Sequence, residues 1–180
     1  MTEAWVEWWC CSWRWAHPEW QAQLSTVAGL GAGNWGAIAH SRHADLLRSI
    51  AIDPSQPPAI CEDLMRWLAL SPLQKDTALS LAGRVCFSSR HSAPLSNESH
   101  DLWCQRFAKA LRPGLWLDPG VEDERLLLGA WLGEVCWSRL RLTWAPGEVG
   151  EPLAHLPSSK LQTLWQAVLW RVTTPSSTGN

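Results

Sequence analysis

The segment from Val121 to Trp144 (VEDERLLLGAWLGEVCWSRLRLTW) constrains the fold most, because it joins a helical apolar pattern to charges suited to helix ends. Acidic residues fill positions 122–124 and basic residues stand near the end, which complements the dipole of an α-helix. Its apolar side chains recur three and four positions apart, at Leu128, Trp131, Leu132, Val135 and Cys136. The pattern predicts a buried helix at the centre of a core rather than an active site.

Two features complicate this helix. Gly129 and Gly133 lie one turn apart, and each costs about 1 kcal/mol relative to alanine inside a helix. We therefore expect a second helix to approach closely at these positions. After Trp137, apolar and polar residues alternate as far as Trp144, which is a period of two. The segment either gives way to a short strand there or continues as a helix with a basic side.

Helical periodicity returns along the rest of the chain, interrupted by turns that contain proline and glycine. The clearest helix start is the run from Ser71 to Gln74, with serine at the N-cap, proline next and glutamine three positions after the cap. Further helices are expected at about 2–16, 18–28, 43–52, 58–70, 72–87, 98–111 and from 158 onward. They predict an all-α fold, a compact bundle of six to eight helices with either no strand or one short strand pair.

The connectors divide the chain into parts of unequal length. A proline-rich stretch, DPSQPP, fills residues 53–58 and is expected to be an exposed connector. The tryptophan-rich residues 1–52 before it are expected to form a helical N-terminal lobe. Residues 59–173 are expected to form the main helical domain, and residues 174–180 a disordered tail.

Tryptophan is the unusual component, with 15 copies against 2 phenylalanines and no tyrosine. Tryptophan and arginine are enriched at protein interfaces, and a GC-rich coding bias is an equally good explanation of the same composition. One side of the first predicted helix carries four tryptophans, so it is either a core face, which is the safer interpretation, or a docking face. If it docks a partner, the expected anchors are Trp5, Trp8, Trp9 and Trp13, with Arg139 and Arg141 at the rim.

Four histidine and cysteine side chains are candidate zinc ligands. His100 and Cys104 lie one helical turn apart, and Cys86 and His91 precede them. Their spacing matches no standard structural zinc pattern. A buried cysteine beside surface histidines is the preferred interpretation, and we expect no metal.

Other catalytic patterns are weak or absent. The glycine-rich run from Gly29 to Gly36 follows no predicted strand and lacks a lysine after it, so it is interpreted as a linker rather than a nucleotide loop. Neighbours such as Cys10 and Cys11 point in different directions on a helix, which argues against a thiol switch between them. No GxSxG motif is present, and the acidic residues at 122–124 fit a solvated helix start. We expect a protein that is not an enzyme and needs no cofactor.

The charge and the chain start set expectations for location. The net charge of −2 lacks the clustered basic face of a nucleic-acid-binding protein. The first residues have no basic region and carry Glu3 and Glu7, unlike a signal peptide. No apolar run approaches the roughly 20 residues that cross a bilayer, and six scattered cysteines show no disulfide framework. A cytoplasmic protein with reduced thiols is expected.

The last third of the chain resembles a known family in the order of its features. An acidic lead precedes an apolar helix, and a proline-containing connector and a capped C-terminal helix follow it. The residues that carry the resemblance in between are Ala130, Trp131, Leu132, Cys136, Trp137, Arg139, Leu140 and Leu142. The pattern resembles the SctK-type accessory proteins of bacterial type III secretion systems. The short Hrp-type (HrpD-like) form of plant-associated bacteria is most similar in length and in the tryptophan-rich start.

This resemblance implies a function in protein secretion. Members of that family are cytoplasmic, largely helical, non-enzymatic adaptors peripheral to the inner-membrane secretion apparatus. In its sorting platform they join the C-ring or pod protein to the inner-membrane ring protein. The expected partners are therefore those two proteins, with no nucleic acid and no membrane insertion. The family supplies no catalytic residues to transfer.

Two alternatives of different classes stay open. A type III secretion chaperone or regulator would bind one exported protein, although such chaperones are usually more acidic than this chain. A small helical enzyme or metal-binding domain would show bound metal or metabolite after purification.

Overall fold

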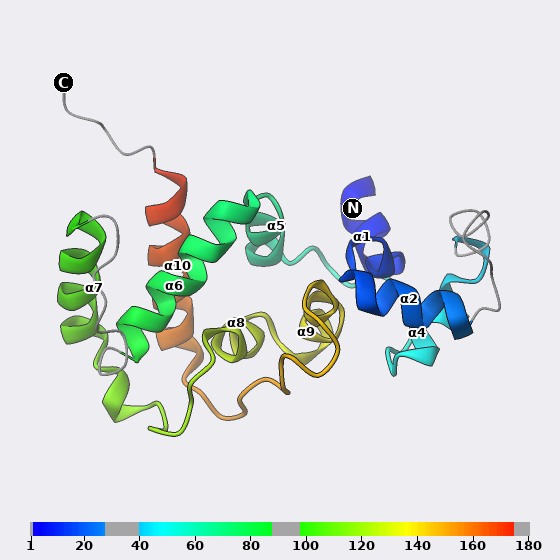
Figure 1. Cartoon of the computed structure of the whole chain (residues 1–180). Helices are drawn as coiled ribbons and strands as arrows, with labels where there is room; N and C mark the ends of the chain where they lie inside the picture. Colours follow the sequence, from blue (N-terminus) through cyan, green and yellow to red (C-terminus); the bar gives the residue numbers. More distant parts are fainter. Residues whose placement is uncertain (1, 28–39, 88–97, 175–180) are drawn as a thin grey trace. The chain divides into compact units, whose positions relative to one another are not determined.

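The structure, a computed structural model, describes residues 2–27, 40–87 and 98–174. Within these ranges it contains nine α-helices and three short 3-10 helices, and no strand (Figure 1). The predicted all-α class is confirmed, and the helix count lies just above the expected six to eight. The predicted glycine-rich linker, the residues 88–97 between two predicted helices and the tail from residue 175 lie outside the described residues.

The elements follow one another in a simple order. The α-helices are α1 (Glu3–Cys10), α2 (Pro18–Val27), α4 (His43–Ser49), α5 (Glu62–Leu68), α6 (Pro72–Cys86), α7 (Glu98–Leu111), α8 (Glu124–Leu132), α9 (Glu134–Leu140) and α10 (Ser158–Thr173). The 3-10 helices are η1 (Ser12–Trp15), η2 (Pro113–Leu115) and η3 (Arg141–Thr143).

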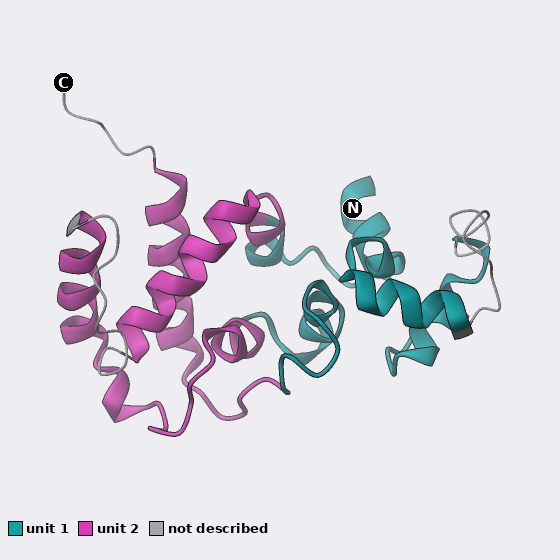
Figure 2. Cartoon of the chain, viewed as in Figure 1, with its two compact units in different colours: residues 1–65, 132–150 teal, residues 66–131, 151–180 magenta. Residues whose placement is uncertain are grey.

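The chain forms two compact units, coloured separately in Figure 2. Unit 1 comprises residues 1–65 and 132–150, and unit 2 comprises residues 66–131 and 151–180. This division differs from the predicted one, in which 59–173 formed a single domain. Residues 132–150, which include the second half of the segment from Val121 to Trp144, group instead with the N-terminal part of the chain.

A hydrophobic cluster of unit 1 joins the N-terminal elements to the returning segment. Its buried members are Cys11, Trp13, Ala16, Leu24, Leu46, Leu47, Ile50, Ile52 and Leu142. Backbone bonding reinforces this packing, since the His17 amide donates to the Leu142 carbonyl at 2.7 Å. The Trp20 indole donates to the Trp144 carbonyl at 3.0 Å. The core of unit 1 is therefore built from residues far apart in the sequence.

In unit 2, α6 packs against both α7 and α10. Polar contacts tie these helices together at their edges. Arg84 of α6 forms an ion pair with Asp101 of α7 at 2.8 Å, and both side chains are mostly buried. Arg171 of α10 donates to the Ser99 carbonyl of α7 at 3.2 Å. The predicted apolar stripe of α10 is buried in full, at Leu161, Leu164, Trp165, Val168 and Leu169.

The single helix predicted within 121–144 is wrong, because the structure breaks it at Gly133. This glycine has a φ of 82°, a positive backbone angle that residues other than glycine rarely adopt. A Cβ at Gly133 would meet no atom within 4 Å, so the glycine serves a change of backbone direction and not the close helix approach that we expected. The alternating stretch after Trp137 forms the end of α9 and then η3, not a strand.

Other helix boundaries also differ from the prediction. The first helix ends at Cys10, and η1 follows after a single intervening residue with non-helical angles. Pro58 does not open the next helix, since α5 begins at Glu62. The preceding helix ends at Ser49, where Ala51 turns the backbone with φ of 58°. Local periodicity therefore located the helices but extended them into the turns that tertiary packing imposes.

The capping box predicted at the start of α6 is confirmed. The Ser71 hydroxyl accepts from the Gln74 amide at 3.3 Å, and the Gln74 side chain accepts from the Ser71 amide at 2.9 Å. Both bonds satisfy amides that have no partner within the helix. The side-chain amide of Gln74 also donates from its nitrogen to the Val172 carbonyl at 3.2 Å, which links the start of α6 to the end of α10.

Loss of this cap should cost measurable stability. We expect Ser71→Ala to lower the free energy of unfolding by about 1 kcal/mol, because one helix-start amide loses its acceptor. Ser71→Asp is the matched control, since aspartate also accepts at an N-cap and should leave stability nearly unchanged. Urea unfolding followed by circular dichroism measures both variants. Equal stability of Ser71→Ala and the parent chain would show that the box contributes nothing.

Candidate protein-binding surface

The predicted tryptophan anchors gather, but in the interior of unit 1. Trp5, Trp8 and Trp9 of α1 are all buried. Their ring centroids lie 5.7 Å apart for Trp5 and Trp8, 5.5 Å for Trp5 and Trp9, and 6.5 Å for Trp8 and Trp9. Trp13 is also buried, within the cluster that includes Leu142. These positions support the core interpretation of the four residues, and their part in partner binding stays a prediction.

The proline-rich connector is held against α1 by two of these indoles. The Trp5 indole donates to the Pro58 carbonyl, and the Trp9 indole donates to the Ser55 carbonyl, both at 3.0 Å. An indole N–H buried without a partner is costly, so each bond fixes the connector as well as the ring. The connector is thus part of the framework of unit 1, not a free linker.

Arg139 was predicted at the rim of a partner surface, but it is buried in unit 1 and only 3% exposed. Its guanidinium lies 3.8 Å from the centroid of the Trp9 ring. Its Nε donates to the Trp9 carbonyl at 3.0 Å, and an Nη donates to the Asp53 carbonyl at 3.1 Å. Burial lowers the pKa of Arg139, yet the carbonyls and the ring face accommodate its charge. Arg139 connects α9, α1 and the connector.

Arg141 is half-buried and lies at a second aromatic contact. Its guanidinium is 5.9 Å from the centroid of the Trp20 ring, and one nitrogen donates to the Ile50 carbonyl at 3.5 Å. The two arginines are therefore both directed at tryptophan rings of unit 1. The predicted place of Arg141 at the rim of a partner surface stays a prediction.

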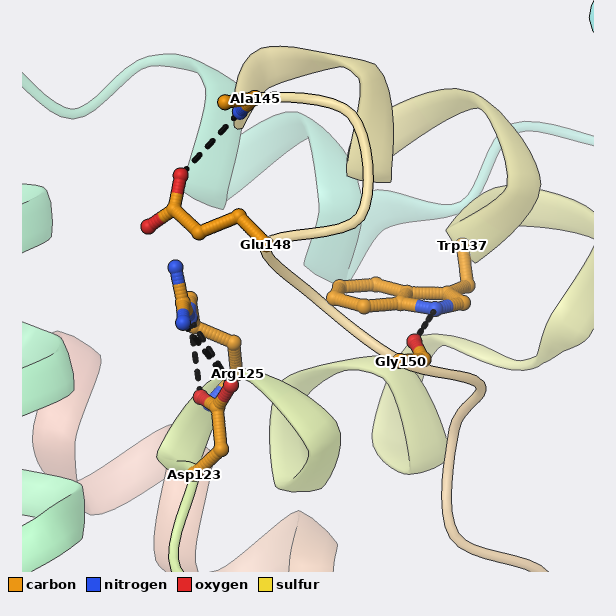
Figure 3. Close-up of polar contacts among 6 residues, drawn as sticks. All are labelled: Asp123, Arg125, Trp137, Ala145, Glu148 and Gly150. Atoms are coloured by element: carbon orange, nitrogen blue, oxygen red, sulfur yellow. Dashed lines mark hydrogen bonds and ion pairs between the residues drawn. The ribbon is translucent and has the colours of Figure 1, made fainter.

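The turn after η3 is also fixed to unit 1. Figure 3 shows the Trp137 indole donating to the Gly150 carbonyl, at 3.3 Å, and the Ala145 amide donating to the Glu148 carboxylate, at 3.2 Å. The Trp137 and Trp144 rings lie 5.6 Å apart. Residues 145–150 are thereby closed into a defined turn.

Figure 3 also shows the start of α8, which belongs to unit 2. The Asp123 carboxylate accepts from the Arg125 amide and from its Nε, both at 2.9 Å. An aspartate just before a helix satisfies an amide that the helix leaves unpaired. The role of Asp123 is therefore structural, as expected for an acidic helix start.

A different tryptophan lies on the surface, in unit 2. Trp170 of α10 is 63% exposed and lines a cavity of about 540 Å³. The cavity lies between the end of α10 and the segment that runs from α5 into α6. Its lining residues are Arg66, Ala69, Leu70, Gln74, Gln166, Leu169, Trp170 and Thr173. Leu73, next to Gln74, is 76% exposed.

The composition of this cavity suits an apolar side chain of a partner. Leu70 and Leu169 are buried and supply an apolar floor. Arg66, Gln166 and Thr173 add polar groups to the lining, and the bond from Gln74 to the Val172 carbonyl links α6 to α10 beside the cavity. An exposed tryptophan beside a cavity with apolar and polar lining groups suits an interface hot spot, in which aromatic anchors supply most of the binding energy. We call the lining residues together with Leu73 the Trp170 surface.

The sequence contained a signal for this surface. Buried positions of α10 follow a regular spacing through Leu161, Leu164, Trp165, Val168 and Leu169, and Trp170 lies outside that set. A tryptophan off the buried stripe of an amphipathic helix is expected to face solvent. Only the position of the α5–α6 segment, which forms the opposite wall, could not be read from sequence.

The rejected zinc ligands can be placed in part. Cys86, His100 and Cys104 lie in or at the ends of α6 and α7, whereas His91 is outside the described residues. Burial raises the pKa of Cys86 to about 12 and that of Cys104 to about 11, which opposes the thiolate form that binds zinc. In the described ranges, no group of three or more histidine, cysteine or acidic residues is arranged to hold a metal ion.

Among the described helices, none combines the length and the apolar composition that crossing a bilayer requires. The chain matches no known family model, no curated protein and no solved structure.

Proposed function

We propose that this protein is a non-enzymatic adaptor that binds other proteins through the Trp170 surface. The observation that carries the proposal is the exposed indole of Trp170 at the edge of a cavity of about 540 Å³ with an apolar floor. Exposing a tryptophan to water forfeits the hydrophobic free energy that its burial would supply. A partner that covers Trp170 and fills the cavity would recover it.

The resemblance of the 130–142 region to SctK-type proteins supports a specific setting for this adaptor. In that setting the protein lies in the cytoplasm beneath the secretion apparatus and links the pod protein to the inner-membrane ring protein. The buried contact of Arg139 with Trp9 in unit 1 and the Trp170 surface of unit 2 suit a protein that supports contacts rather than reactions.

A pull-down with one test variant and one matched control examines this proposal. The full chain, tagged after Asn180, is used to capture partners from the cytosol of the native bacterium. Trp170→Ala removes the proposed anchor, whereas Trp15→Ala removes an indole of unit 1 that is 46% exposed. We expect the pod protein to be recovered by the parent chain and by Trp15→Ala. Its affinity for Trp170→Ala should fall at least about tenfold, the usual effect of losing an aromatic anchor.

The other outcomes are informative in different ways. Recovery of the pod protein with equal affinity by all three chains would reject the Trp170 surface but retain the adaptor function. Recovery of one exported protein in stoichiometric amount, without ring components, would replace the adaptor by a secretion chaperone. Recovery of a bound metabolite or metal with no protein partner would reject both.

A further inference from the structure

A second cavity of unit 2, of about 330 Å³, is lined by the end of α7, the η2 turn and the first turn of α10. Three of its lining residues are the cations Lys109, Arg112 and Lys160, and none of its lining residues is acidic. Lys109 and Arg112 are exposed, and Lys160 is half-buried. Within the part of the chain that the structure describes, none of the three forms an ion pair. The cavity therefore carries positive charge that no described acid compensates.

Arg112 has a backbone conformation that arginine rarely takes. α7 ends at Leu111, and Arg112 follows with a φ of 53° and a ψ of 60°, in the left-handed region. Glycine usually occupies this position after a helix, because a side chain there crowds the backbone. The turn is held by its own bonds, since the Arg112 amide donates to the Ala108 carbonyl at 2.9 Å and the Leu115 amide donates to the Arg112 carbonyl at 3.1 Å. A guanidinium is thus placed at the cavity against the local backbone preference.

Lys160 is placed against the local electrostatic preference. It stands in the first turn of α10, where the helix dipole is positive and acidic side chains are favoured. The sequence places no acid in that turn, and the N-cap residue, Pro157, offers no side-chain acceptor. Two of the three cations therefore occupy positions that local rules disfavour, and both line the same cavity. Such exceptions are expected mainly where a site requires them.

Apolar groups accompany these cations. Leu115 lines the cavity and is 78% exposed, and Trp116 beside it is half-buried. The Trp116 indole donates to the Leu111 carbonyl at 3.1 Å, which holds the ring at the end of α7. The phosphates of a nucleic acid would contact the cations but not the apolar groups, and the chain has a net charge of −2 without a clustered basic face. An acidic peptide that also carries an apolar side chain would contact both.

We propose that this cavity binds an acidic segment of a partner protein, whose carboxylates pair with the three cations and whose apolar side chain covers Leu115. Carboxylates accept charge-assisted hydrogen bonds from arginine and lysine, and these are stronger than bonds between neutral groups. We call the three cations together with Leu115 and Trp116 the basic surface. It shares no lining residue with the Trp170 surface. The inference therefore goes beyond the proposed function and gives the chain a second place for a partner.

Fluorescence anisotropy with the full chain tests the charge pairing. The probe is a labelled peptide of sequence EDLLEDE, and its control is QNLLQNQ, in which amides replace the carboxylates. We expect the control to bind at least about tenfold more weakly than the probe. The affinity for the probe should also fall when the salt concentration rises from about 0.05 M to about 0.5 M. Equal binding of the two peptides, or binding that salt does not weaken, would overturn the proposal.

Substitutions locate the bound peptide. Lys109→Gln should weaken binding of EDLLEDE about threefold, and the variant that combines it with Arg112→Gly and Lys160→Gln should weaken it at least about tenfold. Arg106→Gln removes an exposed charge of α7 that does not line the cavity, so this matched control should bind like the parent chain. An equal loss in Arg106→Gln would show that only the net charge matters and would overturn the proposal.

Arg112→Gly by itself separates binding from folding. Glycine adopts a φ of 53° readily, so this variant should unfold at a temperature no lower than the parent chain. A weaker affinity for EDLLEDE, by about threefold, would then come from the missing guanidinium and not from a damaged fold. Unchanged affinity in this stable variant would contradict the place given to Arg112 in the basic surface.

Three further comparisons distinguish other sites and other ligands. Trp170→Ala should bind EDLLEDE like the parent chain, and a loss there would place the peptide on the Trp170 surface and overturn the proposal. Failure of the basic surface with an intact Trp170 pull-down would leave the adaptor function standing. Tighter binding of phosphatidylserine vesicles or of a single-stranded oligonucleotide, lost in the triple variant, would assign the basic surface to a lipid or a nucleic acid and reject the acidic peptide.

Discussion

Replacing Arg139 with leucine is expected to destabilise unit 1 by about 3–5 kcal/mol. The buried Trp9 carbonyl would lose its donor at 3.0 Å, and an acceptor left unpaired in the interior costs about 1–3 kcal/mol. The part-buried bond to the Asp53 carbonyl, at 3.1 Å, would be lost as well. The guanidinium also lies 3.8 Å from the Trp9 ring centroid, and that favourable contact would be lost. Leucine restores apolar volume but none of these interactions. A loss of this size is a large fraction of the stability of a small domain.

Two further variants identify which property of Arg139 matters. Arg139→Lys keeps the charge but loses the planar set of guanidinium donors. We therefore expect it to lower the free energy of unfolding, but by less than Arg139→Leu does. Arg106→Leu on α7, where the side chain is exposed, is the matched control and should change stability by less than about 0.5 kcal/mol. Urea unfolding monitored by tryptophan fluorescence and circular dichroism measures all three. A loss below about 1 kcal/mol for Arg139→Leu would show that solvent or neighbouring groups replace its contacts.

The helical class was predictable because its determinants are local. The capping box at Ser71 and Gln74 involves residues three positions apart, and the structure forms both of its bonds. The buried stripe of α10 repeats every three or four residues and is likewise buried as predicted. Amphipathic spacing and caps act within a few residues, so one sequence suffices to recognise them.

The environment of Arg139 was not predictable for the opposite reason. Its hydrogen-bond acceptors include the carbonyls of Trp9 and Asp53, which lie far from it in sequence. A basic residue near a helix end is usually exposed, and only tertiary packing reveals that this one is buried. Gly133 is a second case, since its positive φ depends on the direction that the chain takes after α8 and not on the apolar pattern.

The candidate surface was partly within reach of the sequence. Trp170 departs from the buried spacing of α10, which marks it as an exposed aromatic residue.

Replacing Trp165 with alanine is expected to destabilise unit 2 by at least about 4 kcal/mol. Trp165 is fully buried, and its ring stacks on Trp131 at 5.8 Å and meets Trp67 edge-on at 6.0 Å. Its indole donates to the Leu127 carbonyl at 3.2 Å, which connects α10 to α8. Truncation of a buried tryptophan costs about 3–5 kcal/mol through lost burial and the cavity left behind. Each aromatic pair adds about 0.5–1.5 kcal/mol to that loss.

The same helix supplies the matched control for this prediction. Trp170 lies five positions after Trp165 and is mostly exposed, so Trp170→Ala should change the free energy of unfolding by less than about 1 kcal/mol. Trp165→Phe keeps an aromatic ring but loses the donor to the Leu127 carbonyl. Its loss in the free energy of unfolding should lie between those of Trp165→Ala and Trp170→Ala. Comparable losses for Trp165→Ala and Trp170→Ala in urea unfolding would contradict the burial assigned to each. A stable Trp170→Ala chain would also ensure that any loss of partner binding reflects the missing indole and not a damaged fold.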